Sequence, residues 1–330
     1  MTFERLNDHF ERALKIDFNP DIDKIIILSD SHKWDRGETD FFKNVESIYL
    51  GVLDYYHRNN FKLVLLGDIE EGAADVLQHV LDNYSDTFKK ENLFLPNNYF
   101  RIYGNHDHDW KKDDVRKKLD SIMGGPITVI PALRLGDQIF VVHGHEGDLF
   151  SDELHKFSQI ILRLLKRTFE QLIGKKPSAA ENSKIRSRRA QLLYEWGKIN
   201  KKIVIAGHTH LAYFESVSLT RIMSRRIRKL ELEKEQLPQA GIASSPLEEM
   251  DKAHRIMETH DRFHQLDESL PDDSLPLYFN SGCCKYSDGL TGIETADGVI
   301  SLIKWTKMRN VAPERLVLAS RRLSAVISKI

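Results

Sequence analysis

The sequence predicts an α/β fold, and two observations lead to this prediction. Five apolar runs of strand length each stop at a polar loop that carries Asp, Asn or His. Apolar residues with helical spacing lie between these runs, at about 39–58, 71–82 and 112–121. Alternation of strands and helices is typical of sheets whose functional loops gather at the carboxyl ends of the strands. We therefore expect one polar, functional face at that edge.

The composition is that of an ordinary globular protein. Of the 330 residues, 41% are hydrophobic and 29% are charged, which allows a complete core. The 48 Lys and Arg nearly balance the 49 Asp and Glu, so the net charge of -1 gives no strong signal for nucleic acid or membrane binding. No apolar run is long enough to span a bilayer, and residues 1–20 lack the pattern of a secretory signal. We expect a cytoplasmic protein without a transmembrane segment.

Cysteine chemistry is not expected to contribute to function. The two cysteines, Cys283 and Cys284, are adjacent, and neighbouring positions strain a disulfide. We expect both side chains to pack inside a reduced protein. A metal site built from cysteines is therefore excluded.

The elements follow one another in a regular order after a short amphipathic start. Apolar and β-branched residues predict five buried strands, at 24–28, 62–66, 99–103, 139–142 and 203–206. A further strand is expected at 275–280. It precedes a hairpin of 292–295 and 299–305, whose connection Asp297-Gly298 is a typical turn pair.

Two helical insertions interrupt this order within what we interpret as one domain over residues 1–330. Residues 149–200 carry apolar positions at helical spacing and then a basic stretch, and they form a candidate lid. Residues 220–273 contain a basic helix, a Pro, Gly and Ser loop at 238–246 that we expect to be flexible, and a second helix near 247–265. Basic stretches of this kind are most often solvated faces of helices. The alternative is that their Arg side chains bind the phosphate oxygens of an anionic substrate.

The loops after the five strands supply side chains suited to metal binding. In chain order they are Asp30-x-His32, Gly67-Asp68, Gly104-Asn105-His106-Asp107, His143, and Gly207-His208-x-His210. These ligand types suit Mn, Fe, Zn, Ni or Co rather than a soft, thiolate-bound metal. Seven candidate ligands exceed the need of one ion, and two ions about 3.5–4 Å apart can share a bridging carboxylate. Each glycine is expected to allow a sharp turn at the strand end.

These five blocks, in this order, resemble the signature of calcineurin-like metallophosphoesterases over residues 24–305, outside the two insertions. The resemblance implies a four-layer sandwich of two mixed β-sheets flanked by helices. It also implies a phosphoester hydrolase with two divalent metal ions, Mn²⁺ first among them. A hydroxide that bridges the metals would attack, in line, a phosphoester of a small phosphorylated or nucleotide-type substrate.

The resemblance also implies a role for each residue. The metal ligands would be Asp30, His32 and His210 for the first ion, Asn105, His143 and His208 for the second, and Asp68 as the bridge. His106 would stabilise the transition state or protonate the leaving oxygen, and Asp107 would orient His106. Four further side chains are candidate substrate contacts: His145, Arg188, Arg189 and Tyr286. Glu71, beside a ligand loop, is equally compatible with a surface position and a substrate contact.

Other functions remain open at the level of sequence. A nucleotide-sugar or lipid pyrophosphohydrolase is the first alternative, because the insertion at 149–200 falls where UDP-2,3-diacylglucosamine pyrophosphohydrolases carry a lid. His106 stands where those enzymes often have Arg, which argues against identity with them. A protein Ser/Thr phosphatase is a weaker alternative and a nuclease weaker still. A metal-stabilised binding scaffold is the non-enzymatic alternative, although the Asn105-His106 pair favours an enzyme. The sequence does not indicate an oligomeric state.

Overall fold

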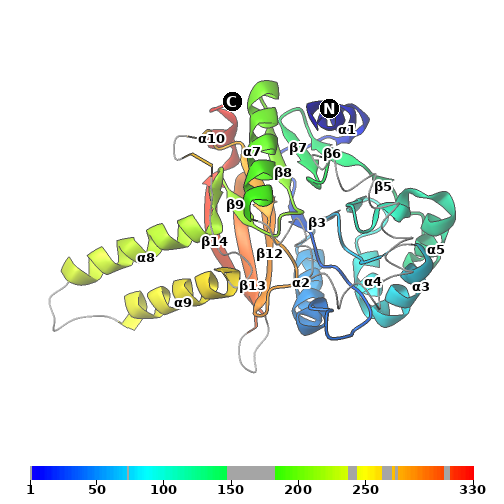
Figure 1. Ribbon diagram of the computed structural model, residues 1–330, viewed down its shortest axis with the longest axis horizontal. Helices are drawn as coiled ribbons and strands as arrows, with labels where there is room; N and C mark the ends of the chain where they lie inside the picture. The colour runs from blue at the N-terminus through cyan, green and yellow to red at the C-terminus, as the bar shows by residue number, and fades with distance from the viewer. Residues whose placement is uncertain are drawn as a thin grey trace, which may run out of the picture.

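Two mixed β-sheets of seven strands each form the centre of the computed structural model (Figure 1). The structure describes residues 2–72, 74–146, 183–236, 244–261, 270–271, 274–307 and 313–330. Helices flank both sheets, which confirms the expected α/β sandwich. The predicted strands at 62–66, 139–142 and 203–206 agree with the observed ones residue for residue.

The first sheet has the strand order β14-β13-β12-β2-β3-β4-β5. Strands β2 to β5 are parallel neighbours, while β12, β13 and β14 are antiparallel. The strand bounds are β2 (Ile25–Leu28), β3 (Lys62–Leu66), β4 (Tyr99–Ile102), β5 (Val129–Ile130), β12 (Gly289–Ala296), β13 (Val299–Thr306) and β14 (Glu314–Arg322). The hairpin expected around residues 297–298 is the β12–β13 pair.

The second sheet has the strand order β1-β6-β7-β8-β11-β9-β10. Its central strands β7, β8 and β11 are parallel. The strand bounds are β1 (Leu14–Ile16), β6 (Ala132–Leu135), β7 (Ile139–Val142), β8 (Ile203–Ala206), β9 (Ala212–Phe214), β10 (Val217–Ser218) and β11 (Tyr278–Ser281).

Alternate residues of each central strand face opposite sides of its sheet. In β2, Ile25 and Ile27 enter a core shared with the second sheet, whereas Ile26 and Leu28 face the core beneath helices α2 to α5. Both faces are buried, which explains why this strand is a continuous apolar run. A third cluster packs the far face of the second sheet against α1 and α7. The layers therefore run helices, sheet, sheet, helices.

The helices occupy the outer layers and one projecting pair. Their bounds are α1 (Thr2–Arg12), α2 (Glu46–Arg58), α3 (Ala74–Asn83), α4 (Ser85–Asn92), α5 (Asp113–Met123), α7 (Ser183–Asn200), α8 (Leu219–Gln236), α9 (Ser244–Asp261) and α10 (Leu323–Ile327), with short 3₁₀ turns η1 (Phe42–Asn44) and η2 (His108–Lys111). Among the described residues, no helix is long and apolar enough to cross a bilayer.

The two expected insertions have different structures where they are described. Residues 149–182 lie outside the described residues. Residues 183–200 form α7, whose Leu193 and Trp196 are buried against Phe140 of the second sheet, so this helix packs in the outer layer of the sandwich. In the region 220–273, α8 and α9 lie side by side and project from the body (Figure 1).

Candidate functional site

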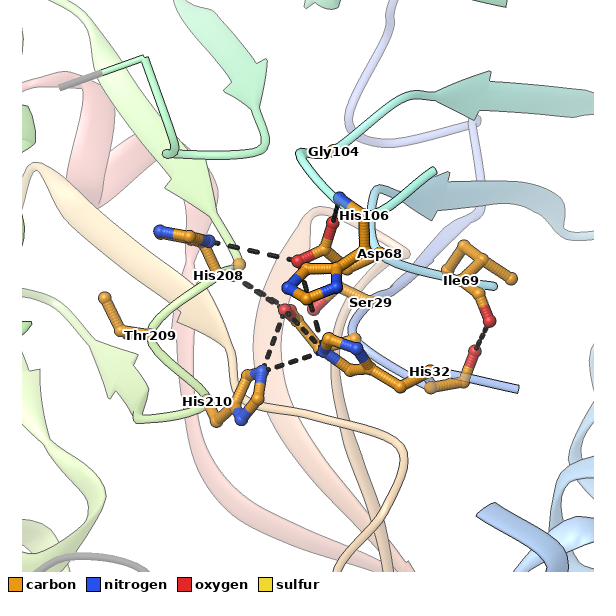
Figure 2. Close-up of polar contacts among 12 residues, drawn as sticks. Ser29, His32, Asp68, Ile69, Gly104, His106, His208, Thr209 and His210 are labelled. Carbon is orange, nitrogen blue, oxygen red and sulfur yellow. Dashed lines mark hydrogen bonds and ion pairs between the residues drawn. The ribbon is translucent and has the colours of Figure 1, made fainter. Parts of the chain in front are cut away.

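The candidate ligands lie together at the carboxyl edges of the two sheets. Asp30 and His32 follow β2, Asp68 follows β3, His143 follows β7, and His208 and His210 follow β8. Three groups have ligand atoms that all lie within 4.8 Å of one another: Asp30, His32 and His210; Asp68, His143 and His208; and His32, Glu71 and His106. Figure 2 shows the imidazoles of His32, His106, His208 and His210 gathered around Asp68.

Five of these residues have an unusual backbone conformation. The φ angle is positive at Asp30 (54°), His32 (49°), Asp68 (52°), His208 (66°) and His210 (57°). Non-glycine residues adopt this left-handed region infrequently, and such residues cluster at functional sites where the surrounding structure holds them. Five of the side chains that converge at the site therefore lie on strained backbone positions.

The glycines before the ligands serve two purposes. Gly67 has φ +72° and makes the turn expected from the sequence. Gly104 and Gly207 do not have a left-handed backbone, which corrects the expectation that each glycine makes a sharp turn. A Cβ on Gly207 would lie 2.7 Å from Asp30 Oδ2, and one on Gly104 would collide with the Asp68 carboxylate. These two glycines leave room for the carboxylates.

Ligand atoms of the first group face one another at short range. His210 Nε2 lies 3.2 Å from Asp30 Oδ1 and 3.1 Å from His32 Nε2. His32 Nε2 lies 3.9 Å from the same Asp30 oxygen. The Asp30 carboxylate is fixed by the backbone N–H of His208, which donates to both of its oxygens at 3.2 and 2.9 Å. Three donor atoms thus surround one small volume.

Asp68 lies between the first and second groups. Its Oδ2 is 3.2 Å from His143 Nε2, 3.9 Å from His208 Nδ1 and 4.0 Å from His32 Nε2. Its Oδ1 accepts a hydrogen bond of 2.9 Å from the backbone N–H of His106. One oxygen of Asp68 is therefore held by the protein, while the other faces both groups.

The donor set fits divalent cations. Among the described residues, His143 Nε2, both ring nitrogens of His208 and Asn105 Oδ1 are buried and have no hydrogen-bond partner. Buried polar atoms are normally satisfied, so such a cluster requires an explanation. His143 Nδ1 lies 2.8 Å from the Leu66 carbonyl, which can only accept, so this nitrogen donates and leaves Nε2 as the free ligand atom. A metal ion would satisfy His143 Nε2, Asn105 Oδ1 and one of the two ring nitrogens of His208.

The electrostatics of the second group are those of a buried carboxylate among imidazole rings. Burial alone would raise the pKa of Asp68, but His143 and His106 hold it well below its usual value. Burial disfavours a charged His143, yet Asp68 raises its pKa to about 10. Burial and the nearby Arg189 lower the pKa of His208 well below its usual value. The site is thus an anionic carboxylate in a buried position that is stabilised by positive charge.

The sequence assignment of Asp107 requires correction. Both oxygens of this buried carboxylate accept backbone N–H groups, from Gly104 at 2.6 Å and from Ile69 at 2.8 Å. The carboxylate that pairs with the His106 ring is Glu71, whose Oε1 lies 2.8 Å from His106 Nδ1. Asp107 therefore braces the loops after β3 and β4, and Glu71 orients His106.

Glu71 is the main residue that sequence reasoning did not place. Its other oxygen, Oε2, lies 2.6 Å from His32 Nδ1. Burial would raise the pKa of Glu71, but His106 and His32 lower it strongly, and Glu71 in turn raises the pKa of His106 to about 9 against the effect of burial. The only sequence signal was its position three residues after Asp68, which did not distinguish it from a surface acid.

A fully buried ion network lies next to these loops. Lys33, which follows His32, is 2.5 Å from Glu91, and Arg101 pairs with Glu70, the neighbour of Glu71. The backbone N–H of Glu71 donates to the Lys33 carbonyl at 2.8 Å. Breaking a buried ion pair of this kind is strongly destabilising, so the network fixes the two loops relative to one another.

The four candidate substrate contacts lie in different environments. Arg188 is exposed, whereas Arg189 is buried and close enough to His208 to lower its pKa. His145 is buried with its ring centroid 5.4 Å from that of His143, and its Nδ1 lies 3.4 Å from Glu146 Oε1. Tyr286 is fully buried, and its hydroxyl donates to the His210 carbonyl at 2.7 Å. The structure thus gives Tyr286 a place in supporting the His210 loop instead of a substrate contact.

One of three comparisons with known proteins identifies a family for this chain. A profile of the calcineurin-like phosphoesterases matches residues 23–212. A search of curated proteins found no match. Among solved structures, a protein from Staphylococcus aureus assigned as a 5′-nucleotidase, in complex with alpha-ketoglutarate, is similar at 10% identity and a TM-score of 0.33, over 92% of this chain and 57% of that one. The chain thus spans little more than half of that protein, and a likeness this distant carries no information on activity.

Proposed function

Because the chain belongs to the calcineurin-like phosphoesterase family, we propose that it is a metal-dependent hydrolase of phosphoesters. The substrate class that we propose is a small phosphorylated or nucleotide-type compound, and the proposed cofactor is a pair of divalent cations, with Mn²⁺ the first candidate. The observation that carries the proposal is the position of Asp68, whose Oδ2 faces His143 at 3.2 Å and His32 at 4.0 Å.

The residues divide between two ions. Seven side chains would hold them: Asp30, His32 and His210 for one, Asn105, His143 and His208 for the other, and Asp68 for both. When bound, divalent cations act as Lewis acids that polarise a phosphoryl oxygen and lower the pKa of water. The backbone amides of His106 and His208 keep the two carboxylates aimed at this volume.

His106 would hold a proton for the reaction. Glu71 accepts from its Nδ1 and, together with Asp68, raises its pKa to about 9, so the ring is protonated at neutral pH. A protonated imidazole can stabilise negative charge on the phosphoryl group or donate to the leaving oxygen. Arg189, buried beside His208, would add a second positive charge for the phosphate oxygens.

The pyrophosphohydrolase alternative depends on the segment 149–182, and no contact among the described residues adds support to it.

Measurements of bound metal and of hydrolysis together test the main proposal. We would measure metal content by elemental mass spectrometry, and hydrolysis of p-nitrophenyl phosphate, bis-p-nitrophenyl phosphate and UDP-sugars with Mn²⁺, Zn²⁺ and Mg²⁺.

We expect about two metal ions per chain and a clear preference for one of these substrates, which would distinguish a monoesterase, a diesterase and a pyrophosphatase. Asp68→Asn should lose metal and lower turnover by roughly 100-fold or more, because the proposed shared ligand is weakened. Full metal content and activity in Asp68→Asn would rule out the two-ion site. Metal without turnover on any substrate would favour the binding scaffold.

A further inference from the structure

A cavity of about 370 Å³ opens beside the candidate metal centre. Its lining residues come from three separate parts of the chain: His32, Trp34, Thr39, Phe41, Glu71, Gly72 and Lys285. Small-molecule sites have volumes of about 300–1,000 Å³, so this cavity is of the size for one small organic group. His32 and Glu71 belong to both the cavity and the candidate centre. A group in the cavity would therefore adjoin a phosphate held at the centre.

Two aromatic side chains give this cavity an apolar wall. Phe41 is 50% exposed, although a large apolar side chain gains from burial. Trp34 is partly buried and packs against the core beneath α2 to α5. Aromatic side chains at a site bind flat rings by stacking, and base–aromatic stacking tolerates different rings. The wall thus suits a flat ring.

The loop that carries both aromatic residues is held in place before any ligand binds. Asp40, which is buried, accepts the backbone N–H groups of Trp34 at 3.2 Å and Arg36 at 2.9 Å, and also the Tyr84 hydroxyl at 2.5 Å. The Lys43 ammonium donates to the Gly37 carbonyl at 2.6 Å. Such preorganisation lowers the entropy cost of binding a ligand.

Lys285 supplies a positive charge at the same cavity. The structure gives its ammonium group no ion pair or hydrogen bond to another described residue, and the side chain is half-buried. It lies close enough to His106 to affect that residue electrostatically. A cation between an aromatic wall and the candidate centre is placed to meet a phosphate oxygen.

We propose that this cavity binds a flat aromatic or heteroaromatic ring of the substrate against Trp34 and Phe41, while Lys285 pairs with a phosphate oxygen. This inference rests on the proposed phosphoesterase function and narrows its substrate to phosphoesters whose alcohol portion carries such a ring. A nucleobase and a simple aryl group share this chemistry, and the substrates below distinguish them.

The first test compares three substrates. Adenosine 5′-monophosphate carries a nucleobase, p-nitrophenyl phosphate an aryl ring, and ribose 5-phosphate no flat ring. In the unmodified enzyme, we expect KM for at least one ring-bearing substrate to be about 10-fold lower than KM for ribose 5-phosphate. A difference of about 10-fold is the effect expected from one stacked ring. The substrate with the lower KM identifies the kind of ring.

Variants then assign the effect to the cavity. Trp34→Ala and Phe41→Ala should each raise KM for the preferred ring-bearing substrate by roughly 5–10-fold and leave that for ribose 5-phosphate unchanged. Trp34→Phe keeps a ring and should restore most of the preference. Lys285→Gln should raise KM for all three substrates. Ile22→Ala is the control, because Ile22 is 73% exposed and precedes β2, at the opposite edge of the sheet.

A second test does not depend on turnover. Of the four tryptophans, Trp110, Trp196 and Trp305 are buried, so Trp34 is the one whose fluorescence a ligand in this cavity can reach. Adenosine or phenylphosphonate should quench the protein's fluorescence in a saturable way, and Trp34→Phe should abolish the change.

The two proposals fail in different ways. The ring site would be overturned, and the phosphoesterase would stand, if all three substrates were hydrolysed with equal KM. The same conclusion would follow if Trp34→Ala and Phe41→Ala raised KM equally for all three substrates. No hydrolysis of any substrate with saturable, Trp34-dependent quenching would support the ring site and overturn the phosphoesterase. The absence of both hydrolysis and quenching would overturn both.

Discussion

The Glu71 carboxylate lies between His32 and His106, with Oε2 2.6 Å from His32 Nδ1 and Oε1 2.8 Å from His106 Nδ1. The two rings it joins have centroids 4.9 Å apart. Figure 2 shows the rings of His32 and His106 next to one another. One side chain therefore aims a proposed metal ligand and the proposed proton donor at the same volume. A partner of this kind fixes the ring orientation and tautomer of each histidine.

Replacing Glu71 tests this relationship. Glu71→Gln removes the charge and offers an N–H₂ group to one of the two rings, so we expect kcat to fall by roughly 10–100-fold, the usual effect of losing a ligand-orienting partner. Metal content should fall as well, because His32 loses its fixed orientation. Steady-state kinetics and elemental mass spectrometry would measure both. Glu231→Gln, at an exposed position of α8, is the control; a Glu71 variant as active as this control would contradict the assignment.

His106→Ala should separate metal binding from catalysis. We expect the variant to retain its metal ions, because the other donor groups remain, and to lose roughly 100- to 10,000-fold in turnover, the usual contribution of a general acid. The loss should be smaller for p-nitrophenyl phosphate than for an alkyl phosphate, since p-nitrophenolate leaves without a proton. An alkyl ester hydrolysed at the unmodified rate would show that His106 has no part in the reaction.

Asp107→Asn should act on stability more than on the leaving group. An amide can accept only one of the two backbone N–H groups from Gly104 and Ile69, which leaves a buried donor unsatisfied at a cost of about 1–3 kcal/mol. We expect a lower urea midpoint and weaker metal binding. The remaining turnover should decline equally for aryl and alkyl esters. A loss confined to alkyl esters would instead mean that Asp107 acts through the proton of His106.

The two cysteines should be unreactive in the folded protein. Both are buried, and burial raises the pKa of Cys283 from 9.0 to about 11 and that of Cys284 well above its usual value. A thiol whose pKa is raised by folding stabilises the protein fully below its unfolded pKa, and this stabilisation is lost as the pH rises through the folded pKa. The contribution of Cys283 should therefore disappear between about pH 9 and 11.

Thiol labelling and denaturation would check this expectation. Ellman's reagent should label neither thiol of the native protein at neutral pH, but both after unfolding in urea. The urea midpoint of Cys283→Ala should depend less on pH between about 9 and 11 than that of the unmodified protein. Rapid labelling of the native protein would contradict the buried positions.

Sequence reasoning predicted the central strands well because local composition decides them. Both faces of β2 and β3 are buried, so each must be an unbroken apolar run that is visible without a structure. Strands β5 and β10, of two residues each, carry no such pattern and were missed, as were β1, β6, β9 and the edge strand β14, whose exposed residues interrupt the apolar run. Helix α7 was assigned to an insertion because its basic residues obscured the face that packs on β8.

The sequence by itself determined the candidate metal centre, because a ligand that directly follows a buried strand has only one edge of the sheet at which it can lie. Asp30 and Asp68, which follow neighbouring strands of one sheet, could therefore be grouped from strand ends alone, whereas His208 follows a strand of the second sheet and was added by the resemblance to metallophosphoesterases. Only the tertiary structure decided that Glu71, rather than Asp107, pairs with His106, and that Trp34 and Lys285 share a cavity. These pairings depend on how loops from separate strands fold over one another, and neither the spacing nor the periodicity of a sequence specifies the distance between two loops.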